Sequence, residues 1–351
     1  MSERILTFHE AIRDALDLCL RHDPEVYLMG LGVPDKKGLF GSTVGLVDAY
    51  GVERVRDMPA SENAMTGVAL GSALAGMRPV LSHQRVDFAL LAMEQMVNQV
   101  AKWHYAFGAK QPVPLVIRMI VGRGWGQGAQ HSQSLVSCFA HVPGLQVIAP
   151  ATPHDAKGMM IAAVESDDPV VIFEHRWLFN TQGVVPEGIY RVPIGEARVA
   201  REGTDVTIAA SSYMVLEALR AAERLAQDSI RAEVLDLRTL APLDTGALVR
   251  SVRKTGHLVA ADIGWTSYGA SAEVVAAVAE RAFDALQSAP RRVASPDVPS
   301  PSAPALSDGF WPRARAIVDA VRAQRGLPEL PPDLASELPH DVPDPSFVGP
   351  F

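Results

Sequence analysis

The chain has 351 residues, of which 48% are hydrophobic and 21% are charged, so it is long enough for two folded domains. Its formal net charge of −8 argues against nucleic acid or an anionic membrane as the main partner. The two cysteines lie in separate segments without metal-ligand spacing, and no apolar run is long enough to span a bilayer. We therefore expect a soluble, cytoplasmic protein without a signal peptide.

In chain order, the first half alternates predicted helices with short apolar strands. Helices are predicted at residues 7–22, 44–50, 62–77, 87–107, 132–140 and 152–165. Strands are predicted at residues 25–30, 52–56, 78–82, 114–120, 145–149 and 169–174. This alternation is typical of an α/β domain in which helices cover both faces of a parallel sheet.

A second, smaller unit of the same kind follows the connection at residues 180–191. Its strands are predicted at residues 205–210, 231–237 and 257–261, and its helices at 213–227, 245–254, 270–283 and 311–325. The fold class predicted for the chain is therefore α/β with two parallel-sheet domains, at 1–190 and 191–326. Residues 327–351 are rich in Pro and Asp, lack periodicity, and are predicted to form an irregular tail, which could wrap on a neighbouring subunit.

The stretch from Asp57 to Gly67 is predicted to join a strand to the start of a helix. Pro59 forces an extended or turning backbone, and Ser61 is predicted to cap the following helix, with Glu62 in its first turn. This helix is rich in Gly and Ala, which costs helix stability, so we expect something to pack unusually close against it. On chemistry alone, Glu62 could simply complement the helix dipole.

Three features each follow a predicted strand: Glu62, the helix start at Phe88, and the Gly-rich loop at residues 122–132. Ligands bind at the carboxyl ends of strands in doubly wound sheets, so these features are expected to converge on one site. The loop does not match the phosphate-binding pattern G-x-x-x-x-G-K-[ST]. Within it, His131 is as compatible with a helix-cap neighbour as with a catalytic residue.

Segments in both halves together resemble the β subunit of 2-oxoacid dehydrogenase E1 components, which are transketolase-like enzymes that use thiamine diphosphate (ThDP). The segments that carry the resemblance lie at residues 57–62, 87–98, 130–134, 143–145 and 236–244. The similarity runs from about Thr7 to Gly326. It implies a transketolase-like pyrimidine-binding domain at 1–190 and a transketolase C-terminal domain at 191–326.

The resemblance implies roles for several residues of the predicted site. Glu62 matches the carboxylate that bonds to pyrimidine N1′ of ThDP, which favours the tautomer whose 4′ nitrogen takes the C2 proton. Phe88 matches the aromatic ring that packs on the pyrimidine face, with Met58 and Gln84 as further cofactor contacts. His131 matches the histidine that handles proton transfers.

The resemblance also implies that the cofactor site is shared with a second kind of chain. An α-like E1 subunit would hold the diphosphate and Mg²⁺ in an α₂β₂ heterotetramer, and no Gly-Asp-Gly motif occurs in this sequence. A structural K⁺ site of the family would fall on Leu115, Ala163, Val164, Ser166 and Asp168. Ser166 and Asp168 stand where the family has Asp and Asn, which weakens that expectation.

Some residues near the expected site depart from the family pattern. His83-Gln84-Arg85 stands where apolar or small residues are usual, and Arg123 and Trp125 occur in the loop before His131. We interpret His83 and Arg85 as making the pocket polar, for a hydroxylated or anionic substrate. The alternative for Arg85 is a salt bridge to the α-like partner.

Three functions are compatible with these residues. The first is an E1β subunit that decarboxylates a small 2-oxoacid and passes the acyl unit to a lipoyl-bearing E2 acyltransferase. The second is a split transketolase or sugar-branching enzyme that transfers a two-carbon unit to a keto sugar. The third, a binding subunit without catalysis, is disfavoured because Glu62, Phe88 and His131 are all present. The frequency of E1β subunits in the family favours the first.

Overall fold

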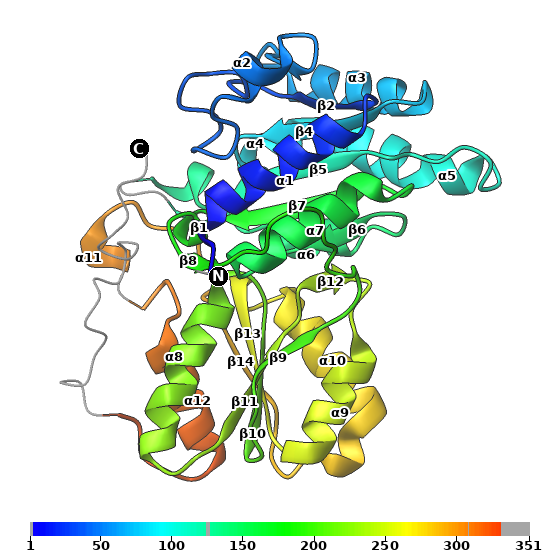
Figure 1. Cartoon of the computed structure of the whole chain (residues 1–351). Helices are drawn as coiled ribbons and strands as arrows, with labels where there is room; N and C mark the ends of the chain where they lie inside the picture. Colours follow the sequence, from blue (N-terminus) through cyan, green and yellow to red (C-terminus); the bar gives the residue numbers. More distant parts are fainter. Residues whose placement is uncertain (1–2, 124–126, 308, 331–351) are drawn as a thin grey trace. The chain divides into compact units, whose positions relative to one another are not determined.

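The chain forms two compact units in a computed structural model that describes residues 3–123, 127–307 and 309–330 (Figure 1). Among the described residues, the first unit comprises the chain up to Val121 together with Cys138–Ile194, and the second comprises Gly122–Ser137 and Gly195–Leu330. The loop Gly122–Ser137 thus belongs with the second unit although its sequence interrupts the first. Most of the predicted tail lies outside the described residues.

The first unit is built on a parallel sheet with the strand order β6-β7-β5-β4-β2-β3, and each neighbouring pair runs parallel. These strands are β2 (Val26–Met29), β3 (Val55–Arg56), β4 (Arg78–His83), β5 (Val116–Val121), β6 (Gln146–Ile148) and β7 (Val170–His175). The prediction of a parallel sheet is confirmed here. A short antiparallel pair, β1 (Ile5–Thr7) with β8 (Gln182–Val184), was not predicted.

Most helices of this part of the chain begin within two residues of where the sequence predicts them. They are α1 (Phe8–His22), α2 (Leu46–Tyr50), α3 (Glu62–Leu74), α4 (Val86–Ala89), α5 (Ala101–Ala106), α6 (Val136–Ala140) and α7 (Pro153–Glu165). Thr7 caps α1 through a capping box with Glu10, because each side chain bonds the other residue's backbone N–H. Within the described part of the chain, no helix is both long and apolar enough to cross a membrane.

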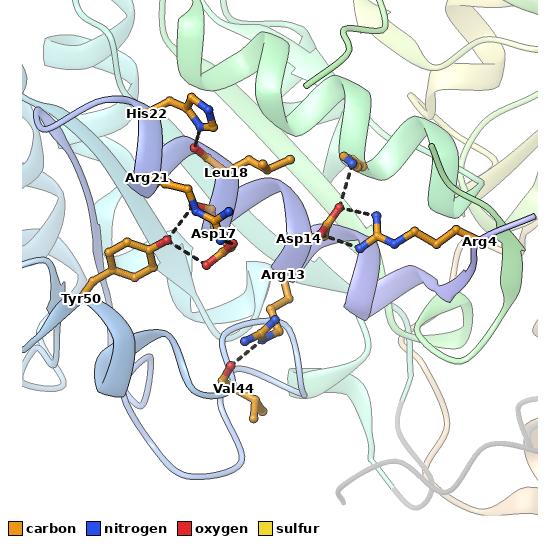
Figure 2. Close-up of polar contacts among 10 residues, drawn as sticks. Arg4, Arg13, Asp14, Asp17, Leu18, Arg21, His22, Val44 and Tyr50 are labelled. Carbon is orange, nitrogen blue, oxygen red and sulfur yellow. Dashed lines mark hydrogen bonds and ion pairs between the residues drawn. The ribbon is translucent and has the colours of Figure 1, made fainter. Parts of the chain in front are cut away.

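Helix α1 is fastened to its neighbours by polar contacts (Figure 2). The Asp14 carboxylate accepts hydrogen bonds from Arg4 at 2.7 and 2.9 Å and pairs with the buried ammonium of Lys157 on α7 at 2.8 Å. The Tyr50 hydroxyl donates to the Asp17 carboxylate at 2.8 Å. These contacts hold α1 on α7 and connect it to the end of α2.

The prediction of one regular helix at residues 87–107 is wrong. The segment divides into α4, a 3-10 helix at Leu90–Ala92, a π-helix at Gln95–Val100, and α5. Gly144 packs against the junction between the π-helix and α5, where a Cβ on residue 144 would lie 1.8 Å from the carbonyl oxygen of Ala101. Only glycine fits this approach, at a backbone φ of +101° that also favours it.

The second unit contains a mixed sheet with the order β14-β13-β10-β11-β9. Its strands are β9 (Arg198–Arg201), β10 (Val206–Ala210), β11 (Ala232–Asp236), β13 (Leu258–Trp265) and β14 (Arg291–Ser295), and a further strand, β12 (Thr239–Ala241), lies outside it. The prediction of an all-parallel sheet is wrong at one edge, because β9 runs antiparallel to β11. Neither β9 nor β14 was predicted.

Helices cover this second sheet on two sides. The helices are α8 (Tyr213–Gln227), α9 (Thr245–Thr255), α10 (Ala270–Ala282), α11 (Pro304–Ser307) and α12 (Ala314–Gln324). Figure 1 shows α8 and α12 on one face of the sheet and α9 and α10 on the other. Buried aliphatic side chains from β10, β11, β13, α9 and α10 form a common core.

Candidate active site

Glu62 is the first residue of α3, at the end of a turn that Asp57 fixes. The Asp57 Oδ1 accepts the backbone N–H of Gly32 at 2.9 Å and that of Met58 at 3.0 Å. Ser61 occupies the N-cap position, but its side chain makes no cap hydrogen bond, so the predicted capping role is wrong. Glu62 is half-buried, and among the described residues nothing donates a hydrogen bond to its carboxylate. It is therefore an acceptor available to a ligand.

The turn after β2 joins the Glu62 stretch to the Phe88 stretch. Leu31 accepts a hydrogen bond from the Gln84 side-chain amide at 3.2 Å, and the next residue, Gly32, donates its N–H to Asp57. Phe88 lies in α4, half-buried, four residues after Gln84. The structure therefore brings together two of the three features predicted to converge, at the carboxyl ends of β2, β3 and β4.

His83 and Arg85, the predicted substrate contacts, are both buried. Burial lowers the pKa of His83 to about 4, so this imidazole is neutral near pH 7, and its Nε2 lies 3.3 Å from the Thr66 hydroxyl. The Arg85 Nε donates to the Asp87 carboxylate at 3.2 Å, and the two side chains are 3% and 2% exposed. A neutral His83 cannot attract an anion by charge. Of the two residues, only Arg85 can therefore bind an anionic substrate group through its charge.

Arg176 is another buried basic residue, and it follows a neighbouring strand of the same sheet. It follows β7 directly, and its guanidinium lies 4.8 Å from the centre of the Phe40 ring. Burial and then the charge of Arg85 lower the pKa of Arg176 to about 10. Since β5 lies between β4 and β7, Arg85 and Arg176 follow the two strands that neighbour β5 in the sheet.

His131 ends a 3-10 helix at Ala129–His131, is half-buried, and donates its backbone N–H to the Gly128 carbonyl at 3.1 Å. It belongs to the second unit, whereas Glu62 and Phe88 belong to the first. The helix predicted from residue 132 begins only at Val136. Trp125 lies outside the described residues.

The residues expected to bind K⁺ are instead engaged by protein groups. Arg78 Nη1 donates to the carbonyl oxygens of Val164 at 3.1 Å and Ser166 at 3.0 Å. The Asp168 carboxylate accepts from His104 at 2.7 Å, and the Asp168 carbonyl accepts from the Ser166 hydroxyl at 3.0 Å. Arg78 thus places a positive charge beside two of the carbonyl oxygens of the expected K⁺ site, where it would compete with a bound cation.

Comparison with known families defines the class of protein that this fold and site represent. Residues 5–182 match the family Transketolase, pyrimidine binding domain, and residues 195–317 match Transketolase, C-terminal domain. A solved structure titled "Split gene transketolase, inactive beta4 tetramer" superposes with a TM-score of 0.75 and 28% identity, covering 92% of this chain and 99% of that one. The chain is a transketolase-type protein with both domains.

Relatives place the chain within that class. It is 41% identical over 329 residues to the acetoin:2,6-dichlorophenolindophenol oxidoreductase subunit beta of Cupriavidus necator, covering 91% of this chain and 97% of that one. It is 39% identical over 317 residues to the pyruvate dehydrogenase E1 component subunit beta of Rickettsia felis, covering 90% and 97%. The chain belongs to this family of E1 β subunits.

Proposed function

We propose that this chain is the β subunit of a ThDP-dependent enzyme that decarboxylates a small 2-oxoacid and transfers the acyl unit to a lipoyl group. One observation carries the proposal: the half-buried Glu62 carboxylate, to which no described residue donates, begins α3 beside the Phe88 stretch. Such an available acceptor fits the protonated ring nitrogen of a cofactor better than it fits a purely structural role. Membership of the E1 β family supports the same assignment.

The residues of the site have distinct roles in this proposal. ThDP, when bound, supplies the carbon nucleophile and takes up the electron pair that departing CO₂ leaves behind. Glu62 holds a proton at pyrimidine N1′, and Phe88 packs against the pyrimidine ring together with Met58 and Gln84. His131 exchanges a proton with the substrate oxygen. None of these roles requires a metal ion bound by this chain.

An α-like subunit would supply the diphosphate and Mg²⁺ half of the site, in an α₂β₂ heterotetramer of the cytoplasm. Exposed apolar side chains around α3 support a partner on this side. Val68 is 54% exposed, Leu90 41% and Leu91 69%, and a Cβ at Gly71 would meet nothing within 4 Å. The close packing predicted for the glycines of α3 is absent among the described residues, so we assign it to the partner.

A split transketolase that transfers a two-carbon unit to a keto sugar is the second candidate. It is favoured by the likeness to the split-gene transketolase and by the buried Arg85 and Arg176, which suit a sugar phosphate. It is weaker than the first because identity to that structure is 28%, against 41% to the acetoin relative.

Co-expression with an α-like E1 chain, followed by a screen of donor substrates, distinguishes the two functions. We expect the purified complex with ThDP and Mg²⁺ to release CO₂ from a 2-oxoacid and to acylate a lipoyl domain. Release of CO₂ without acylation of the lipoyl domain would overturn the acceptor assignment. Transfer of a two-carbon unit between keto and aldehyde sugars would establish the second function instead.

Arg85 is expected to select the substrate. Replacing Arg85 with leucine should raise KM for the true substrate by about 10-fold or more, because a hydrogen-bonding site discriminates strongly when its partner is lost. The affinity for ThDP and the assembly of the complex should not change. Steady-state kinetics and size-exclusion chromatography of the variant complex measure these outcomes.

A second variant separates this effect from damage to the fold. Arg85→Leu removes the ion-pair partner of the buried Asp87, so Arg85→Leu/Asp87→Asn should restore stability without restoring KM. Recovery of KM in the double variant would make Arg85 a structural residue. Loss of assembly in both variants would place it at the subunit interface.

A further inference from the structure

The loop that carries His131 is packed against a distant part of the chain. Residues Gly122–Ser137 lie between β5 and α6 in sequence, yet they cluster with the second unit, which is the C-terminal domain. Three hydrogen bonds join this loop to residues 300–307, the segment that leads into and includes α11. These contacts attach the loop that carries His131 to that segment.

Arg123 makes the principal polar contacts between the two segments. Its guanidinium donates through Nη2 to the carbonyl oxygen of Ser302 at 2.8 Å and through Nη1 to the hydroxyl of Ser307. The Ser307 hydroxyl in turn donates to the Ala303 carbonyl at 3.2 Å. Arg123 is 0% exposed, and Ser307 is likewise 0% exposed. Hydrogen bonds from a charged donor in such a buried place are among the stronger ones in proteins.

Two further contacts lie nearer to His131 and follow the same path. The Ser300 hydroxyl donates to the carbonyl oxygen of Ser132, the residue after His131, at 3.5 Å. At Gly128, three residues before His131, an added Cβ would come within 3.2 Å of the Ser302 Cβ. The backbone on either side of His131 is thus packed against the same segment that Arg123 binds.

A role for Arg123 as a direct substrate contact fits these observations poorly. The sequence alone left that role open, because a basic residue precedes His131 in the loop. In the structure the guanidinium is fully buried and is directed at Ser302 and Ser307. Its hydrogen bonds to Ser302 and Ser307 suit a residue that holds the loop against residues 300–307.

We propose that Arg123 is a positioning residue that fastens the His131 loop to residues 300–307, so that the C-terminal domain sets the position of the catalytic histidine. The catalytic part of this inference rests on the proposed function, which gives His131 its proton-transfer role. The attachment of the loop to residues 300–307 does not rest on the proposed function, and separate experiments test the two parts.

Hydrogen–deuterium exchange of the full-length chain tests the fastening. Arg123→Gln should speed exchange of the amides at residues 127–137 and 300–307 by about 10- to 100-fold, since a charged hydrogen bond is lost at both segments. Arg54→Gln is the matched control, because Arg54 also bonds backbone carbonyls, those of Leu20, Asp23 and Val26, but in the first unit. Unchanged exchange in Arg123→Gln, or equal acceleration in Arg54→Gln, would overturn the fastening.

Kinetics of the reconstituted complex test the positioning of His131. Arg123→Gln should lower kcat by about 10- to 100-fold, the scale expected for a displaced catalytic group, with little change in KM and a shifted pH profile. Arg123→Lys can keep one contact, so its kcat should lie between that of the wild type and that of Arg123→Gln. Arg54→Gln should leave kcat and the pH profile unchanged. Faster exchange with unaltered kcat and pH profile would overturn the positioning role.

A double-mutant cycle measures the coupling between the Arg123 and Ser307 side chains directly. Ser307→Ala removes one acceptor of Arg123. This substitution should therefore change exchange and kcat in the wild type, but should have little further effect in Arg123→Gln. Fully additive effects would show that the two side chains act separately. If the wild-type complex proves inactive on every donor, the proposed function fails, while the exchange data still decide the fastening.

Discussion

Replacing Glu62 with glutamine is expected to lower turnover of the reconstituted enzyme by about 10²–10⁴-fold, the usual scale for a positioned acid–base group. Glutamine has nearly the same size and keeps α3 intact, but it cannot hold a proton at the pyrimidine ring as a carboxylate does. The affinity for ThDP should remain close to that of the wild type. Turnover, ThDP titration and the rate of C2-proton exchange measured on one preparation check all three expectations.

A matched control separates catalysis from the helix-dipole role of Glu62. Glu273 is an exposed carboxylate in the first turn of α10, in the second unit. If Glu62 acted only on the dipole, both substitutions would cost about 0.3–1 kcal/mol of stability and neither would affect turnover. We expect Glu273→Gln to behave in that way. Glu62→Gln with more than about a third of wild-type activity would remove Glu62 from the catalytic assignment.

The largest expected effect on stability comes from the buried ion pair in the sheet of the first unit. Arg118 on β5 donates to the Glu174 carboxylate on β7 at 2.6 and 2.9 Å, and the side chains are 1% and 0% exposed. The same guanidinium donates to the Ser42 hydroxyl at 2.7 Å, in the loop after β2. Arg118→Met should cost about 3–5 kcal/mol of the free energy of unfolding, because it leaves the Glu174 carboxylate buried without its counter-charge.

The double variant Arg118→Met/Glu174→Gln tests this explanation by urea and thermal unfolding. Since it removes both charges, it should recover most of the stability that the single variant loses. A double variant as unstable as Arg118→Met would assign the loss to packing and to the Ser42 contact. The stability of the second unit should be unaffected in either case.

Local patterns in the sequence were sufficient for most of the long helices, for the central strands of both sheets, and for placing the Glu62 and Phe88 stretches near one another. The capping of α1 by Thr7 and the alternation of apolar strands with helices depend on neighbouring residues, so they were predictable. The Glu62 and Phe88 stretches follow strands, and the topology of a parallel sheet then places them at one edge.

Features that depend on distant residues were not predictable from these patterns. Strand β9 forms an antiparallel edge because it pairs with β11, more than thirty residues away, and nothing in its own sequence specifies the direction. Arg78 donates to the carbonyls of Val164 and Ser166, which lie 86 and 88 residues further along the chain. The attachment of the His131 loop to residues 300–307 is of the same kind, since Arg123 by itself reads only as a basic loop residue.

Calorimetry tests most directly whether this chain holds only half of the ThDP site. ThDP with Mg²⁺ is titrated into the purified chain and into its complex with the α-like partner. The claim is that this chain holds the pyrimidine half of ThDP and a partner holds the diphosphate. It predicts no micromolar binding to the single chain and tight, Mg²⁺-dependent binding to the complex. Micromolar, Mg²⁺-dependent binding of ThDP to the single chain would contradict it.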